Sequence, residues 1–151
     1  MVNDARTQTK TFIDTYYTAA NVTKDDDSTA VNVIVCFGNP EYPITRVFKE
    51  KGVDGVYSVA EPTSEALLDA TTQAPWGYRE RVPIDVICID KSGITGTKLK
   101  WKMEAELRRI TESNPTGSQR SLERRGDADQ RLGSTVLYKT RFVLDYVRDT
   151  T

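Results

Sequence analysis

Two segments of the chain carry apolar residues at helical spacing. The first covers residues 4–20, and its apolar stripe comprises Phe12, Ile13, Tyr16, Tyr17, Ala19 and Ala20. The second begins at Thr97 and reaches about Ser113, and its stripe comprises Leu99, Met103, Leu107 and Ile110. Asn3 or Asp4 is the expected N-cap of the first helix and Thr97 that of the second. The pattern predicts two amphipathic helices.

Three other segments have the patterns of β-strands. Val31–Phe37 is almost continuously apolar, which predicts a strand in the middle of a sheet or covered on both faces. Tyr78–Asp90 alternates apolar and polar residues, and we expect Pro83 to lie at an edge or bulge because it has no backbone donor. From Val136 the even positions are mainly apolar or aromatic, which predicts a long half-buried strand.

The middle of the chain has weaker patterns. Ile44–Phe48 and Val53–Val59 are expected to form a β-hairpin around Lys51-Gly52. Residues 64–70 are compatible with a short helix, and Pro75-Trp76-Gly77 predicts a turn.

Residues 115–131 are polar and hold hardly an apolar anchor, which predicts a long loop or mobile arm. The whole order is helix, strand, hairpin, strand, helix, strand. We therefore expect residues 1–151 to form a single α+β domain, in which a mainly antiparallel β-sheet packs against two principal helices, with a β-hairpin and a long polar loop. A chain of 151 residues is long enough to bury a substantial core.

Composition removes several functional classes. The chain has no histidine, which excludes Ser–His and Cys–His mechanisms and His-ligated metal sites. Its net charge of −1 excludes a basic field over the whole protein for nucleic acid. The polar start does not resemble a signal peptide, and no run is long enough for a membrane helix. We expect a soluble protein made in a reducing cytoplasm, with no membrane partner.

Two cysteines, Cys36 and Cys88, lie inside apolar runs. Buried thiols are the favoured interpretation, because cysteine packs as a small hydrophobic residue. A disulfide between two strands and a reactive thiol remain as alternatives.

The strongest catalytic candidate is a metal-dependent nuclease site. Asp85 and Asp90 could hold Mg²⁺ on a strand, with Lys91 beside the attacking water. The spacing argues against it, because Asp90 and Lys91 point to opposite faces of a strand. Asp25-Asp26-Asp27 lacks the spacing of a calcium loop, and residues 93–98 lack the ending of a phosphate loop. We predict no catalytic residue, metal ligand or cofactor, and a solvated Asp85.

Charge is concentrated in residues 98–131, where nine basic and six acidic residues give +3, while the rest of the chain carries −4. A solvated surface is the simplest explanation, and a subunit contact or a weak phosphate-facing surface are alternatives. The loop lacks aromatic residues for stacking on bases, which argues against sequence-specific nucleic-acid binding.

Residues 78–148 resemble the tail terminator (tail completion) and neck proteins of long-tailed bacteriophages. The matching parts are the strand YRERVPIDVICID, the turn KSGITGT, the helix KLKWKMEAELRRI and, after a variable polar loop, the long strand LYKTRFVLDYV. With the N-terminal helix, the resemblance touches most of the chain, and residues 44–74 match least. It is a pattern of elements rather than a diagnostic motif.

The resemblance implies a virion protein, assembled in the host cytoplasm, whose copies form a homo-oligomeric ring, commonly of six. Such a ring caps the tail tube and joins it to the head connector, and no catalytic residues come with the family. A ring requires head-to-tail contacts that close by rotation. From charge and expected exposure we predict subunit contacts at Arg120, Arg124, Arg125 and Arg131 of the loop and Lys98, Lys102, Glu106 and Arg109 of the second helix. Another head–tail connector subunit, a non-enzymatic scaffold domain and a nuclease are the alternative functions.

Overall fold

The computed structural model describes residues 4–38, 44–113 and 120–149. The helices are α1 (Ala5–Tyr16), α2 (Ile44–Lys51) and α3 (Gly96–Ser113), with a short 3₁₀ helix at Ala19–Asn21. The strands are β1 (Val33–Phe37), β2 (Gly55–Val59), β3 (Thr63–Leu68), β4 (Pro75–Cys88), β5 (Ser121–Asp127), β6 (Gln130–Leu132) and β7 (Thr135–Asp149).

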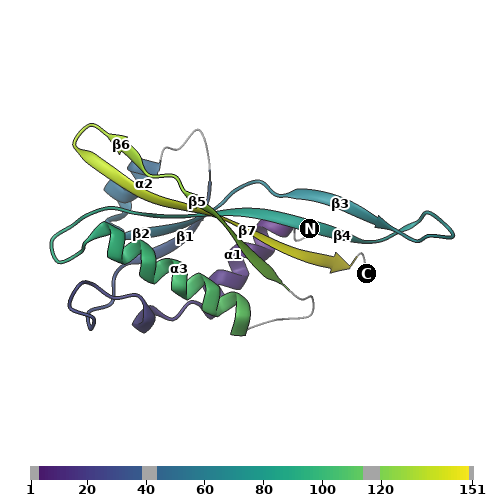
Figure 1. Ribbon diagram of the computed structural model, residues 1–151, viewed down its shortest axis with the longest axis horizontal. Helices are drawn as coiled ribbons and strands as arrows, with labels where there is room; N and C mark the ends of the chain where they lie inside the picture. The colour runs from purple at the N-terminus through teal and green to yellow at the C-terminus, as the bar shows by residue number, and fades with distance from the viewer. Residues whose placement is uncertain (1–3, 39–43, 114–119, 150–151) are drawn as a thin grey trace.

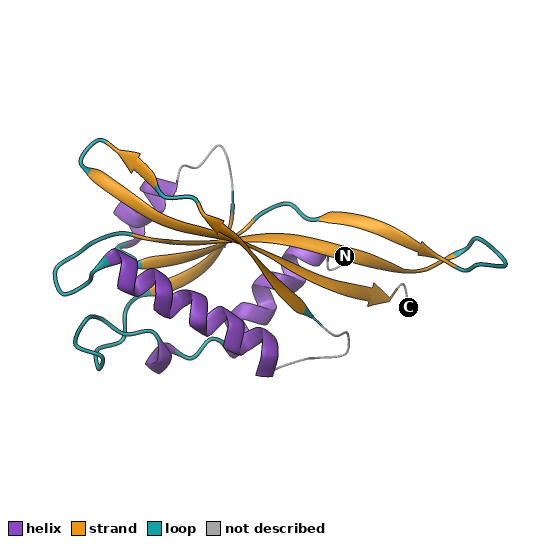
Figure 2. Cartoon of the chain, in the orientation of Figure 1, coloured by secondary structure: helices purple, strands orange, loops and turns teal. Residues whose placement is uncertain are grey.

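The strands form one sheet in the order β1-β2-β4-β7-β5, with β3 paired to β4 and β6 paired to β7 (Figure 1). Only β1 and β2 are parallel; the other described pairs are antiparallel. Helices α1 and α3 pack on one face of the sheet, and α2 packs on the other face near β1 and β2 (Figure 2). This is the α+β class that the sequence predicts.

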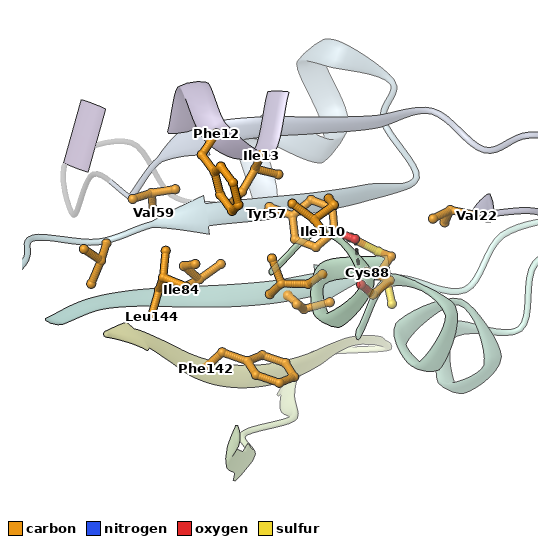
Figure 3. Packing of buried hydrophobic residues seen from close by; sticks show 14 of the residues in the cluster. Phe12, Ile13, Val22, Tyr57, Val59, Ile84, Cys88, Ile110, Phe142 and Leu144 are labelled. Atoms are coloured by element: carbon orange, nitrogen blue, oxygen red, sulfur yellow. Dashed lines mark hydrogen bonds between the residues drawn. The ribbon is translucent and has the colours of Figure 1, made fainter. Parts of the chain in front are cut away.

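The main core lies between the sheet and the pair α1 and α3 (Figure 3). Even positions of β4 and β7 point into it, as the alternation predicts, together with the stripes of both helices. These strand residues are Val82, Ile84, Val86, Cys88, Phe142, Leu144 and Tyr146. At its centre the buried hydroxyl of Tyr57 donates to the main-chain oxygen of Met103 at 2.7 Å, which joins β2 to α3.

A smaller core lies on the other face, beneath α2. Val47 and Phe48 of α2 pack there with Val56, Ile87 and Leu137 of the sheet. The predicted strand at Ile44–Phe48 is therefore wrong. Its apolar residues stand three and four positions apart, which matches one face of a helix, and a run this short does not separate the two periods. Strand β1 is an edge strand, and side chains on both of its faces are covered, one face by each core.

Residues 63–68 form strand β3, so the short helix predicted over 64–70 is also wrong. The strand pairs with the first half of β4, and Pro75-Trp76-Gly77 belongs to β4 instead of forming a turn. The chain reverses between them, where the Asp69 carboxylate accepts hydrogen bonds from the amides of Thr71 and Thr72 at 2.8 and 2.9 Å. The two strands run out beyond the helices at one end of the molecule (Figure 1). We call residues 63–81 the arm.

The polar loop predicted over 115–131 is largely strand. Residues 121–127 form β5, which pairs with β7, and 130–132 form β6, which pairs with the start of β7. Residues 115–119 of that prediction lie outside the described residues. The pattern was hidden because a bulge between Arg124 and Gly126 interrupts the alternation and only Leu122 packs against the core. Residues 121–127 and 130–132 are strands because they pair with β7, although their own sequence has no clear strand pattern.

Several smaller expectations can be compared with the structure. Asp4 caps α1, accepting from the amide of Thr7 at 2.8 Å, as predicted. Thr97 is not the cap of α3, which already begins at Gly96. Pro83 lies inside a central strand, opposite the short connection between β2 and β3, where its carbonyl accepts from the amide of Ala60. Neither β2 nor β3 pairs with Pro83 itself on this side of β4, so the absence of a backbone N–H at Pro83 breaks no hydrogen bond between strands.

Cys88 is buried and Cys36 half-buried, and they form no disulfide. Among the described residues, no helix has the length and the apolar character needed to cross a bilayer.

Candidate interaction surfaces

The carboxylate of Glu106, predicted to be exposed, is buried on the flank of α3. Its side chain accepts from Nε and Nη2 of Arg109 at 2.6 and 2.9 Å, and from the amide of Thr18 and the side chain of Asn21 at 2.7 and 3.0 Å. Only 2% of Glu106 is exposed. Burial alone would raise the pKa of this carboxyl, but these hydrogen bonds outweigh it and lower the pKa. The prediction of exposure is wrong for Glu106, because partners far away in the sequence cover it.

Lys102 also makes contacts within the chain. Its ammonium group donates to the carbonyl oxygens of Thr23 and Lys24 and pairs with Asp27 at 2.8 Å. It thereby holds the loop that follows the 3₁₀ helix against α3. Lys98, one turn earlier, is exposed on the same helix. Arg109, beside Glu106, donates to the main-chain oxygen of Tyr16 at 2.8 Å.

The four arginines predicted as contacts in the polar loop also divide into residues with partners in the chain and residues that are more exposed. Arg120 stacks over the rings of Phe12 and Tyr146, at 4.3 and 4.9 Å from their centroids. Arg124 bonds to the buried Glu104 at 2.8 Å. Arg125 and Arg131 are exposed on β5 and β6.

The eight predicted contact residues therefore do not gather into one patch. Six of them, Lys102, Glu106, Arg109, Arg120, Arg124 and Arg125, make contacts within the chain. Their use between subunits stays a prediction, and Lys98, Arg125 and Arg131 offer the more exposed charges.

The carboxylates considered for a nuclease have structural partners. Asp85 is buried, against our expectation of a solvated residue, and Arg141 binds it through two hydrogen bonds of 2.9 and 3.0 Å. Asp90 accepts from the amide of Gly96 at 2.7 Å and from the Tyr138 hydroxyl at 2.9 Å. Within residues 4–38, 44–113 and 120–149, no group of three or more acidic or cysteine side chains is placed to hold a metal ion.

The segment 93–98, considered for phosphate binding, is shaped by packing. Gly96 lies under the ring of Tyr138, and a Cβ atom there would come within 2.2 Å of that ring. The amides of Thr95 and Gly96 at the start of α3 already bond to the carboxylates of Asp25 and Asp90. A phosphate would have to displace two carboxylates from this helix end.

The sequence prediction missed the three large apolar side chains that are most exposed among the described residues. Leu68 and Trp76 of the arm are 50% and 51% exposed, and Trp101 on α3 is 69% exposed. The register between β3 and β4 shifts at the arm, where Leu67 faces Gly77 and Leu68 faces Pro75. Trp76 therefore lies at a β-bulge, an irregularity that re-aims a side chain. An exposed tryptophan on a projecting strand is typical of a contact surface.

A groove lies between α2 and the β6–β7 hairpin. Its volume is about 380 Å³, and it is lined by Thr45, Phe48, Lys49, Ile89, Lys91, Leu132, Thr135 and Leu137. We call it the α2 groove. It is mainly apolar, its lining includes Lys49 and Lys91, and 37% of Leu132 is exposed. Helix α2 and the β6–β7 hairpin, whose residues line this groove, lie at the opposite end of the long axis of the molecule from the arm tip (Figures 1 and 2).

No protein-family model and no curated protein matches this chain.

Proposed function

We propose that this protein is a structural subunit of a bacteriophage virion, of the tail terminator kind, whose copies assemble into a ring. The ring would cap the tail tube and offer a surface to the head connector. The arm carries the proposal: it projects from the body and exposes Leu68 and Trp76.

The order of elements supports the same interpretation. Helix α1, the long strand β4, helix α3 and the long strand β7 follow one another in the order on which the resemblance rests. The supporting observations are architectural, and the specific virion role comes from that resemblance.

Energetics also favour a partner for the arm. Burying the side chain of an exposed leucine or tryptophan gains about 25 cal/mol per Å² of apolar surface. Aromatic residues that project from a surface are frequent hot spots of protein–protein contacts. An assembly subunit would use such residues to bind its neighbours.

The exposed face of α3 is a second surface with a different place on the molecule. Trp101 lies there near Lys98 and Lys102, and α3 runs along the body, away from the arm tip. In a ring closed through the ends of the molecule, this face would remain available to the tail tube or the connector.

Solution mass tests the proposal. The purified chain should give a discrete species near six copies of the 17.0-kDa chain, about 102 kDa, or another closed ring, by light scattering over a concentration series. Negative-stain images of that species should show rings. A monomer at every concentration, with no ring on addition of tail tubes, would contradict the proposal and favour the scaffold-domain alternative.

A further inference from the structure

The arm tip exposes large apolar side chains, and the α2 groove is mainly apolar. The arm tip is a narrow two-stranded ribbon with Leu68 and Trp76 exposed, and the α2 groove is an open, mainly apolar hollow. Its volume of about 380 Å³ lies within the range of sites that hold a small molecule, about 300–1,000 Å³. It is large enough for an indole ring and part of a leucine side chain.

Their charges are complementary as well. Over the whole arm, Glu65, Asp69 and Glu80 against Arg79 and Arg81 give −1. Asp69 is the charged residue of the tip, residues 68–76. The α2 groove has Lys49 and Lys91 among its lining residues. Lys91 pairs with Asp54 at 3.0 Å, while Lys49 is exposed. Opposite charges at the rim steer association and disfavour wrong partners.

The positions of the two features decide what kind of complex can form. Because they lie at opposite ends of one molecule, the arm cannot reach the groove of its own chain (Figure 1). A contact between two different surfaces leaves one arm and one groove unused in each complex, so further copies add head to tail. Such contacts produce a closed ring if the rotation per copy closes, and a filament if it does not.

We propose that the tip of the arm, with Leu68 and Trp76, docks in the α2 groove of a second copy of this chain. This inference rests on the proposed ring-forming function and adds the residues that join the copies. Trp76 fills the apolar centre of the groove, and Asp69 approaches Lys49. Each subunit gives its arm to one neighbour and receives the arm of the other.

Two complementary variants test this arrangement. The arm variant carries Leu68→Ser and Trp76→Ser, and the groove variant carries Lys49→Glu and Leu132→Ser. All four side chains are exposed, so both variants should keep the circular dichroism spectrum and the urea unfolding midpoint of the wild type. Trp101→Ser is the matched control, because it removes another exposed tryptophan that lies on α3.

Each variant alone should remain at 17.0 kDa at concentrations 100-fold above that at which the wild type assembles. An equimolar mixture should give a dimer of about 34 kDa and nothing larger, because the groove variant supplies the intact arm and the arm variant the intact groove. Trp101→Ser should assemble as the wild type does.

The outcomes separate this inference from the function on which it rests. If the wild type forms rings and the arm variant or the groove variant still does so, or if their mixture stays monomeric, the docking is wrong and the ring function stands. If the wild type itself never assembles, with or without tail tubes, both are wrong.

Discussion

The carboxylate of Glu80 is fully buried at the base of the arm, where its Oε1 accepts two hydrogen bonds from Arg148, at 2.9 and 3.0 Å. Ser64 of β3 donates to the other oxygen. Arg148 also stacks over Tyr78, with 5.2 Å between the guanidinium and the ring centroid. Glu80 of β4 thus ties β3 and β7 to β4 at the base of the arm.

Replacing Arg148 by alanine should destabilise the fold by about 3 kcal/mol, because it leaves a buried carboxylate without its counter-ion. Urea unfolding measures the change. The matched control is Arg79→Ala, which breaks a pair with Asp145 between the same two strands at 2.7 Å. That pair is solvent-exposed, so its loss should cost less than about 1 kcal/mol. Equal losses in the two variants would contradict the special role of Glu80.

Glu106 should make stability depend on pH. Its folded-state pKa lies below the ordinary value of 4.5, because the hydrogen bonds from Arg109, Thr18 and Asn21 outweigh the effect of burial. The stabilisation is therefore present above 4.5 and is lost as pH falls through the folded-state pKa. Glu106→Gln should be less stable than the wild type by about 2 kcal/mol at pH 7. Urea unfolding at pH 7 and pH 3 should show this gap closing at low pH, and a gap independent of pH would count against the assignment.

The two cysteines should react differently. Burial raises the pKa of the Cys88 thiol to about 12, and its Sγ lies 3.2 Å from the carbonyl oxygen of Gly96. Cys36 is only half-buried. A thiol reagent at pH 8 should therefore modify at most one cysteine of the folded protein and both in denaturant. In the Cys36→Ser variant, the folded protein should give no reaction, and rapid labelling of Cys88 would show that this part of the core opens readily.

Replacing Asp90 distinguishes a structural role of its carboxylate from a role in metal binding. Asp90→Ala removes hydrogen bonds to the Gly96 amide and the Tyr138 hydroxyl, and should lower stability by about 1–3 kcal/mol. Thermal unfolding should show the same loss with and without 10-fold molar Mg²⁺. If Mg²⁺ stabilises the wild type but not this variant, or supports cleavage of DNA that the variant lacks, the nuclease alternative would gain.

Long elements with strong periodicity could be predicted from the sequence. Helix α3 and strands β4 and β7 each run for more than twelve residues, so their periods of 3.6 and 2 are repeated several times. Residues 44–51 and 63–68 are shorter and were assigned to the wrong class. In β3 the strand is imposed by pairing with β4, which overrides the local preference.

Surface contacts were harder to predict than the fold. Charge indicated Glu106 and Arg109 as contact residues, but the groups that bind them, at residues 16–21, lie about 85–93 positions away in the sequence. No local pattern contains that information. Trp76 was assigned to a turn because it lies between Pro75 and Gly77. Only the register with β3 shows that these residues belong to an arm.

The most direct test of the account compares the solution masses of Trp76→Ser and Trp101→Ser at a concentration where the wild type is assembled. Both changes remove an exposed tryptophan, one from the arm and one from α3. Because Trp76 docks in the groove of the next copy, we expect Trp76→Ser to shift the assembly midpoint at least 10-fold to higher concentration and Trp101→Ser to leave it unchanged. Unchanged assembly of Trp76→Ser, or loss of assembly in Trp101→Ser alone, would contradict this docking.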